Sequence, residues 1–168
     1  MKRIIITVLA FVFVGNAYSQ IVKEEKLAEV VVTAVNYKYV NQVGTKDAAL
    51  PVKMLERKVA NFDLKNSDIY NDEYDYYTVS FYIPDGKIVA AYDKDGKIIR
   101  TIERFKDINL PQEVRKALVK RFPGWEVEKD VYKVTYGEKK GAKKTYKIKL
   151  KNGDKKLRVK SDAEGNFL

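Results

Sequence analysis

The stretch TYKIKLKNGDKKLRVK, residues 145–160, decides the fold class because it alternates apolar and polar residues on both sides of an Asn-Gly dipeptide. Side chains at alternate positions of a strand lie on one side of a sheet, so this alternation predicts strands with one buried face. Asn152-Gly153 suits the positive φ angles of a tight hairpin turn. We therefore expect two antiparallel strands here, with Tyr146, Ile148 and Leu150 facing inward.

A second alternating run, YYTVSFYI at residues 76–83, precedes the turn dipeptide Asp85-Gly86. One set of its alternate side chains is apolar and suits packing against a helix, so the other set faces outward. Tyrosine and arginine are over-represented where interfaces gain most energy, and lysines steer acidic partners. The outward residues that we take as candidate partner contacts are Tyr76, Tyr82, Lys147, Lys149, Lys151, Arg158 and Lys160. The alternative is that these are ordinary solvent-facing residues, whose lysines discourage edge-to-edge aggregation.

The chain contains an internal repeat. Leu50-Pro51 aligns with Leu110-Pro111 at an offset of 60 residues, and the same offset pairs Val59 with Val119. In both copies the helical segment is followed by alternating runs and turn dipeptides. Similarity at a fixed period marks one structural unit used twice. We expect an α+β fold of two tandem units, each a helix followed by a small antiparallel sheet.

The helix of the second copy is the clearer one. Proline at residue 111 suits a first helical turn, and Pro123-Gly124 ends the helix. Between these limits the apolar residues recur at helical spacing and form one stripe. The stripe consists of Leu110, Val114, Ala117, Leu118 and Phe122. In the first copy Arg57 and Lys58 interrupt the equivalent stripe.

The ends of the two copies resemble a known family. The first copy ends in AYDKDGKII, residues 91–99, and the second in KSDAEGNFL, residues 160–168. Together with the two Leu-Pro helix starts, this pattern resembles the PepSY-like domains that are grouped with β-lactamase-inhibitor-like (BLIP-like) exported proteins. The resemblance implies a helix packed on an antiparallel sheet, used in tandem, and a binding or inhibitory role. Its motifs consist of structural residues, so it implies no site residues.

The first twenty residues have the three-part layout of a secretory signal peptide. A basic start precedes an apolar run at residues 4–14, and Ala17 and Ser19 stand at the −3 and −1 positions of an A-x-A-like cleavage site. The apolar run is much shorter than the roughly 20 residues that a membrane-spanning helix needs. We therefore expect a periplasmic or extracellular chain that begins at Gln20 and has no transmembrane segment after cleavage.

These features divide the chain into four parts. Residues 1–19 form the signal peptide, and residues 20–45 hold an extra N-terminal strand, rich in β-branched residues at 27–35, and a linker. Residues 46–105 form the first PepSY-like repeat and residues 106–168 the second. The chain has no cysteine, so both repeats must fold on hydrophobic burial without disulfides.

Charge is spread unevenly along the chain. Residues 20–99 hold 11 basic and 13 acidic side chains, whereas residues 100–168 hold 20 basic and 10 acidic ones. Such a basic half attracts acidic proteins, anionic glycans or lipid headgroups through a long-range field. Nucleic acid is the least expected of these ligands for an exported chain.

Composition excludes several kinds of catalytic site. The chain has no histidine and no cysteine, which removes Ser-His-Asp and Cys-His nucleophile systems and imidazole or thiolate metal sites. No glycine motif for phosphate binding occurs, and the loop around Gly96 lacks the first and last ligands of a calcium loop. We expect the acidic residues in turns or at solvated positions. The sequence therefore predicts no enzyme, no cofactor and no metal site.

These expectations combine into two functional hypotheses. The first is an exported, non-catalytic module that binds or inhibits a protein of the cell envelope or the extracellular space, through the helix-free face of its sheets. The alternative is a module for a polyanion, either an anionic glycan or lipid headgroups, that uses the basic C-terminal half. A structural role as a self-associating assembly component is a third possibility.

Overall fold

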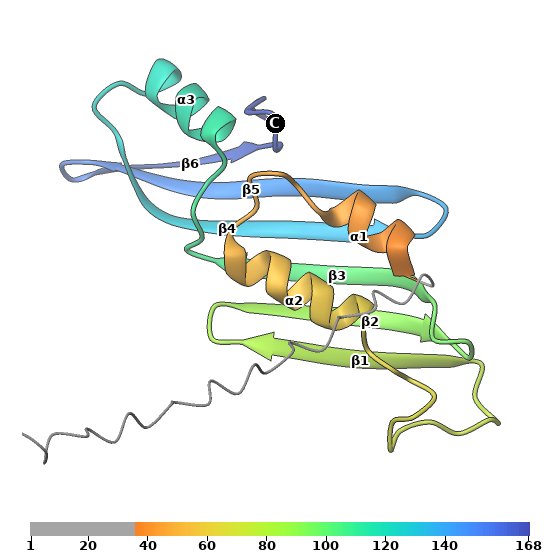
Figure 1. Ribbon diagram of the computed structural model, residues 1–168. Helices are drawn as coiled ribbons and strands as arrows, with labels where there is room; N and C mark the ends of the chain where they lie inside the picture. Colours follow the sequence, from red (N-terminus) through yellow and green to blue (C-terminus); the bar gives the residue numbers. More distant parts are fainter. Residues whose placement is uncertain (1–35) are drawn as a thin grey trace, which may run out of the picture. The chain divides into compact units, whose positions relative to one another are not determined.

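A computed structural model describes residues 36–168 (Figure 1). The expected signal peptide at residues 1–19 and the expected strand at residues 27–35 lie outside the described residues. In chain order the elements are α1 (Tyr37–Val43), α2 (Leu50–Ala60), β1 (Tyr76–Ile83), β2 (Gly86–Asp93), β3 (Ile98–Lys106), α3 (Gln112–Arg121), β4 (Glu126–Gly137), β5 (Gly141–Asn152) and β6 (Lys155–Ser161).

The six strands form one antiparallel sheet in the order β1-β2-β3-β4-β5-β6. The α+β class predicted from the alternating runs is therefore confirmed. The strands of the two expected units do not form two sheets, because β3 pairs with β4 from Arg100↔Gly137 to Lys106↔Val131. This pairing satisfies backbone N–H and C=O groups that two separate sheets would leave free at two further edges.

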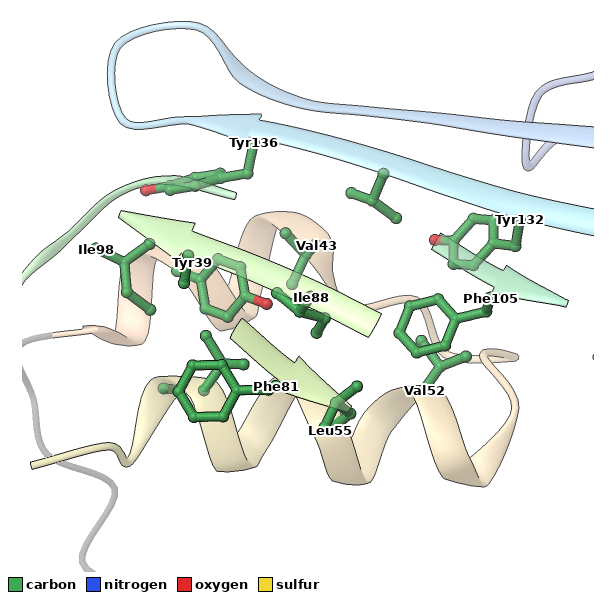
Figure 2. Close-up of a cluster of buried hydrophobic side chains, with 14 of the residues drawn as sticks. Tyr39, Val43, Val52, Leu55, Phe81, Ile88, Ile98, Phe105, Tyr132 and Tyr136 are labelled. Carbon is green, nitrogen blue, oxygen red and sulfur yellow. The ribbon is translucent and has the colours of Figure 1, made fainter. Parts of the chain in front are cut away.

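The helices lie on one face of this sheet, and the core lies between the helices and the sheet (Figure 1). Tyr39 and Val43 from α1 and Val52 and Leu55 from α2 pack over side chains of the central strands (Figure 2). The inward set predicted from alternation is confirmed. Its fully or almost fully buried members are Tyr77, Phe81, Tyr146, Ile148 and Leu150.

Helix α1 is a feature that sequence analysis missed, because it placed residues 20–45 in a strand and a linker. The side chain of Asn36, just before α1, donates hydrogen bonds to the Ala60 and Gly96 carbonyl oxygens, both at 3.1 Å, and accepts one from the Ile98 amide at 2.8 Å. Both Tyr39 and Val43 are fully buried. A helix of seven residues is marginal by itself, so these tertiary contacts stabilise it.

The turns that end the two sequence copies have the same local geometry. Asp93 Oδ1 accepts hydrogen bonds from the amides of Asp95 and Lys97, at 3.0 and 2.9 Å. Asp162 Oδ1 accepts them from the amides of residues 164 and 166, at 3.0 and 2.8 Å. The glycine within each turn, at residues 96 and 165, has a positive φ angle. Each aspartate therefore stabilises an Asx-type turn that only glycine closes without backbone strain.

The two helices of the proposed repeat differ in the face that they bury. Val59 is completely buried, whereas Val119, its counterpart at the offset of 60 residues, is 74 % exposed. The pair Leu50 and Leu110 differs in the opposite direction, because Leu50 is exposed and Leu110 is buried. A helix turns by about 100° per residue, so a shift of one position in the buried stripe is enough to produce this reversal. The expected helix register of the repeat does not match the burial of these residues.

Candidate binding surface on the helix-free face

Strand pairing aligns basic side chains across the face of the sheet that carries no helices. Lys87 on β2 pairs with Arg104 on β3, which pairs with Lys133 on β4. Lys147 on β5 pairs with Lys160 on β6. Paired residues of antiparallel strands point to the same side, so these rows share one surface. We call this surface the basic face; its members are Lys87, Arg100, Arg104, Lys106, Lys129, Lys133, Lys143, Lys147, Lys149, Lys151, Lys156, Arg158 and Lys160.

The seven candidate contacts predicted from sequence all lie on this side of the sheet, but they do not form one compact site. Tyr76 and Tyr82 are 69 % and 66 % exposed on β1. The other five, Lys147, Lys149, Lys151, Arg158 and Lys160, lie on β5 and β6. Four strand spacings separate β1 from β5, which corresponds to about 19 Å. Only a macromolecular ligand can touch both groups at once.

Strands β2 to β4 fill the space between these two groups with residues that sequence analysis did not nominate. Arg100, Arg104 and Lys106 of β3 are exposed on the basic face. The alternation of IIRTIERFK, residues 98–106, would have identified them by the argument used for β5. Ile102, 44 % exposed, lies among them and provides apolar contact area.

A shallow hollow of about 400 Å³ lies on the basic face over β4, β5 and β6. Five of the nine residues that line it are lysine or arginine, whose aliphatic stems can supply apolar wall while the charged ends stay in water. The residues that line it include Lys129, Val131, Lys147, Lys149, Arg158 and Lys160. A second hollow, of about 350 Å³, lies beside Tyr82 and is lined by Lys87 and Arg104. The basic face is thus hollowed near both groups of predicted contacts.

Few acidic side chains neutralise the basic face. Glu128 lies at the bulge of β4, and its carboxylate pairs with the Nζ atoms of Lys149 at 2.8 Å and of Lys156 at 3.7 Å. The hydrogen bond from Lys149 lowers the pKa of Glu128, so this carboxylate stays ionised. Within residues 36–168, the ion pairs of the basic face involve these two lysines alone. The other basic groups are free to meet an anionic ligand.

Two glutamates contradict the expectation that acidic residues lie in turns or at solvated positions. Glu56 of α2 and Glu103 of β3 are 2 % and 1 % exposed on the helix side of the sheet. Glu103 Oε1 accepts hydrogen bonds from the hydroxyls of Tyr39 at 2.9 Å and Thr101 at 2.7 Å. Burial raises the pKa of Glu103 to about 7 and that of Glu56 to about 8, with the charge of Glu103 as the second cause for Glu56.

Both side chains of this glutamate pair are almost fully buried, so the pair is not exposed as a substrate site. Nothing in the sequence indicates that the side chains of Glu56 and Glu103 are buried. Glu56 stands directly before Arg57 and Lys58, a context typical of an exposed helix face. Among the described residues there is no group of three or more histidine, cysteine, aspartate or glutamate side chains placed to hold a metal ion. No helix of residues 36–168 has the length and hydropathy of a membrane span.

Comparisons with known proteins place the chain only loosely. No protein-family model matches it, and no curated protein matches it. Two solved structures are similar to part of it: a DUF2874 family protein from Bacteroides ovatus ATCC 8483, with a TM-score of 0.34, and a BLIP-like protein from Bacteroides fragilis NCTC 9343, with a TM-score of 0.32. Each is 17 % identical, and the match covers 58 % of this chain and 68 % of the other. At this level of similarity nothing about the basic face transfers from either structure.

Proposed function

We propose that this chain is an exported, non-catalytic module that binds an acidic protein of the cell envelope or the extracellular space on its helix-free sheet face. The observation that carries the proposal is the basic face itself, in which lysine and arginine side chains of five neighbouring strands point to one side with little acidic compensation. A surface of one sign accelerates encounter with a ligand of the opposite sign and disfavours other partners.

A protein is a better match than a simple polyanion because the face also carries aromatic and apolar area. Tyr76, Tyr82 and Ile102 are all substantially exposed on the same side. Large amphipathic rings lose water and gain packing when a partner covers them, and they dominate the energy of many protein interfaces. Neutralisation of charge alone makes no use of these side chains.

Export and the non-catalytic role rest on the sequence, whereas the tandem origin also draws on the structure. Export rests on the signal-peptide layout of residues 1–19, and the non-catalytic role on the absence of histidine and cysteine. The tandem PepSY-like origin is supported by the order of elements, since α2 and α3 are each followed by three strands. It is also supported by the matching Asx-type turns at Asp93 and Asp162.

The proposal is tested by comparing two variants with the same change in net charge. Lys147→Glu combined with Lys160→Glu reverses a cross-strand pair in the centre of the β5–β6 part of the basic face. Lys139→Glu combined with Lys140→Glu reverses two exposed lysines at the β4–β5 turn, outside the strands that form the basic face. Each purified chain is immobilised and exposed to envelope and culture fractions at low salt.

We expect a protein that the parent chain and the turn variant retain and that the face variant loses. Such a protein should have an acidic surface, and its retention should weaken as salt rises, because exposed charges are screened over about 10 Å at 0.1 M salt. Equal retention by all three chains would show that the basic face is not the docking surface. Retention of anionic glycan or of vesicles with anionic lipid, with no protein recovered, would favour the polyanion alternative.

A further inference from the structure

The loop that joins α2 to β1, residues 61–75, carries charge opposite to that of the basic face. It holds five acidic side chains and one basic side chain, Lys65, which pairs with Asp95 outside the loop. Within the described residues none of the five acidic side chains takes part in an ion pair. We call residues 61–75 the acidic loop; its exposed acidic members are Asp63, Asp68, Asp72, Glu73 and Asp75.

Apolar and aromatic side chains are exposed beside these carboxylates. Ile69 and Tyr74 of the acidic loop, and Tyr76 directly after it, are all at least half exposed. Charge steers an encounter between two proteins, and large amphipathic rings supply the packing that retains a partner. The acidic loop therefore combines both kinds of contact in one short segment.

The acidic loop is anchored to β1. Tyr70 stacks on Tyr77 of β1 with the ring centroids 5.7 Å apart, and Tyr74 meets the same ring edge-on at 6.3 Å. The Asn71 amide donates a hydrogen bond to the Tyr77 hydroxyl at 3.2 Å, and this hydroxyl donates one to the Asn71 carbonyl oxygen. A loop that is ordered before it binds loses little conformational entropy on docking.

The acidic loop lies far from the hollow of about 400 Å³ over β4, β5 and β6 of its own chain (Figure 1). Strand pairing places the start of β1 at the same end of the sheet as Gly137, the last residue of β4. Val131, which lines the hollow, is about 20 Å from Gly137 along β4, and β4 is three strand spacings, or about 14 Å, from β1. Because the loop is anchored at Tyr77, contact between the loop and the hollow requires a second molecule.

We propose that the acidic loop of one molecule docks on the basic face of a second copy, in this hollow. The inference rests on the proposed function, because it uses the same face and names a second copy as a partner. Charge complementarity favours this occupant, and the exposed rings of the acidic loop pack on the aliphatic stems and charged ends of the basic side chains. The basic residues that line the hollow are Lys129, Lys147, Lys149, Arg158 and Lys160.

The two surfaces are different, so the contact between copies is head-to-tail. Each bound copy still offers a free loop and a free face, and the assembly grows with concentration unless the rotation between copies closes a ring. The chain as a whole is basic, with a formal net charge of +10, and this charge opposes association at low salt. At 0.1 M salt charges are screened beyond about 10 Å, so the charges that face each other across the contact decide the outcome.

Sedimentation of the purified chain at about 0.1 M salt tests the contact with two charge-reversal variants. The face variant combines Lys147→Glu with Lys160→Glu, and the loop variant combines Asp72→Lys with Glu73→Lys. The average mass of the parent chain should rise with concentration, and each variant alone should associate at least about tenfold more weakly, because like charges then face each other. An equimolar mixture of the two variants should associate again, since the intact loop of the face variant meets the intact face of the loop variant.

A matched control separates the acidic loop from net charge. Asp47→Lys combined with Glu113→Lys makes the same change in net charge at two exposed positions outside the loop, and this variant should associate like the parent. Equal weakening in this control, or a mixture of the face and loop variants that stays monomeric, would overturn docking of a second copy.

The result for the parent chain distinguishes this inference from the proposed function. A parent chain that stays monomeric from micromolar to millimolar concentration, or a loop variant that associates like the parent, would refute docking of a second copy. Retention of a foreign acidic protein by the basic face would in that case still support the proposed function. Self-association that both variants lose, with no foreign protein retained from envelope fractions, would support the second copy and contradict an envelope partner.

Discussion

Replacement of Glu56 by glutamine should stabilise the protein at alkaline pH and remove much of its pH dependence. Glu56 is 2 % exposed, and its Oε1 atom has no hydrogen-bond partner. Burial and the nearby charge of Glu103 raise its pKa from 4.5 to about 8, although Lys144 opposes the shift. The folded protein therefore holds a proton on Glu56 that the unfolded chain releases above about pH 4.5.

The sign of the effect follows from this difference in proton binding. Between pH 4.5 and pH 8 the folded state binds more protons than the unfolded state, so stability falls as pH rises through this range. At about 1.4 kcal/mol per pKa unit, the difference between 4.5 and about 8 lowers the free energy of unfolding by at most about 5 kcal/mol. Local rearrangement that admits water reduces the cost of a buried charge, so we expect a loss of about 2 to 3 kcal/mol.

Urea unfolding at pH 5 and pH 9, followed by the fluorescence of Trp125, measures this loss. The parent chain should lose more stability between the two pH values than Glu56→Gln, and the variant should be the more stable protein at pH 9. Some dependence remains in the variant, because the pKa of Glu103 is also raised, to about 7. Glu126→Gln, at an exposed position, is the control and should behave like the parent. If Glu56→Gln changed stability equally at pH 5 and pH 9, the reasoning about a protonated Glu56 would be refuted.

Three further predictions concern the basic face and one turn. Tyr76→Ala and Tyr82→Ala should each weaken partner binding by about 1 to 2 kcal/mol in calorimetry, yet change the free energy of unfolding by less than about 0.5 kcal/mol, since both side chains are exposed. Lys147→Glu should mainly lower the association rate in surface plasmon resonance and reduce its salt dependence; a change confined to dissociation would argue against steering. Gly165→Ala should destabilise by about 1 to 3 kcal/mol in urea unfolding, because its φ is +89° and a Cβ would lie 2.8 Å from the Glu113 carbonyl oxygen, whereas Gly153→Ala, with nothing within 4 Å, should cost less.

Much of the strand structure could be predicted because its signals are local. Alternation in residues 76–83 and 145–160 identified the inward and outward sides of β1, β5 and β6. Gly153 lies in the β5–β6 turn as expected, whereas Gly86 is the first residue of β2, pairs with Ile83 and has no positive φ, so the β1–β2 turn is formed by Pro84 and Asp85. The stripe of Leu110, Val114 and Leu118 likewise identified the buried side of α3. In each of these cases the apolar residues recur over several positions at the repeat of a strand or of a helix. No distant contact is therefore needed to predict the element and its buried side.

The basic face was only partly predicted. Its β5 and β6 members followed from alternation, and the charge count showed that the C-terminal half is strongly basic. Its β3 members were missed because residues 98–106 were considered only as the end of the first copy. The distance between the tyrosines and the lysines could not be estimated, since it depends on how many strands separate β1 from β5.

The sequence by itself determined the α+β class, the side of each alternating strand that is buried, the positions of the glycine turns and the chemistries that the chain lacks. Only the tertiary structure decided that β3 and β4 join the strands into one sheet, that α1 exists, and that Glu56 and Glu103 are buried. The physical reason is the range of the interactions. Alternation and turn preference act between neighbours in the chain, whereas strand order, short helices and the burial of charged groups depend on packing between distant segments, which satisfies backbone groups and excludes water.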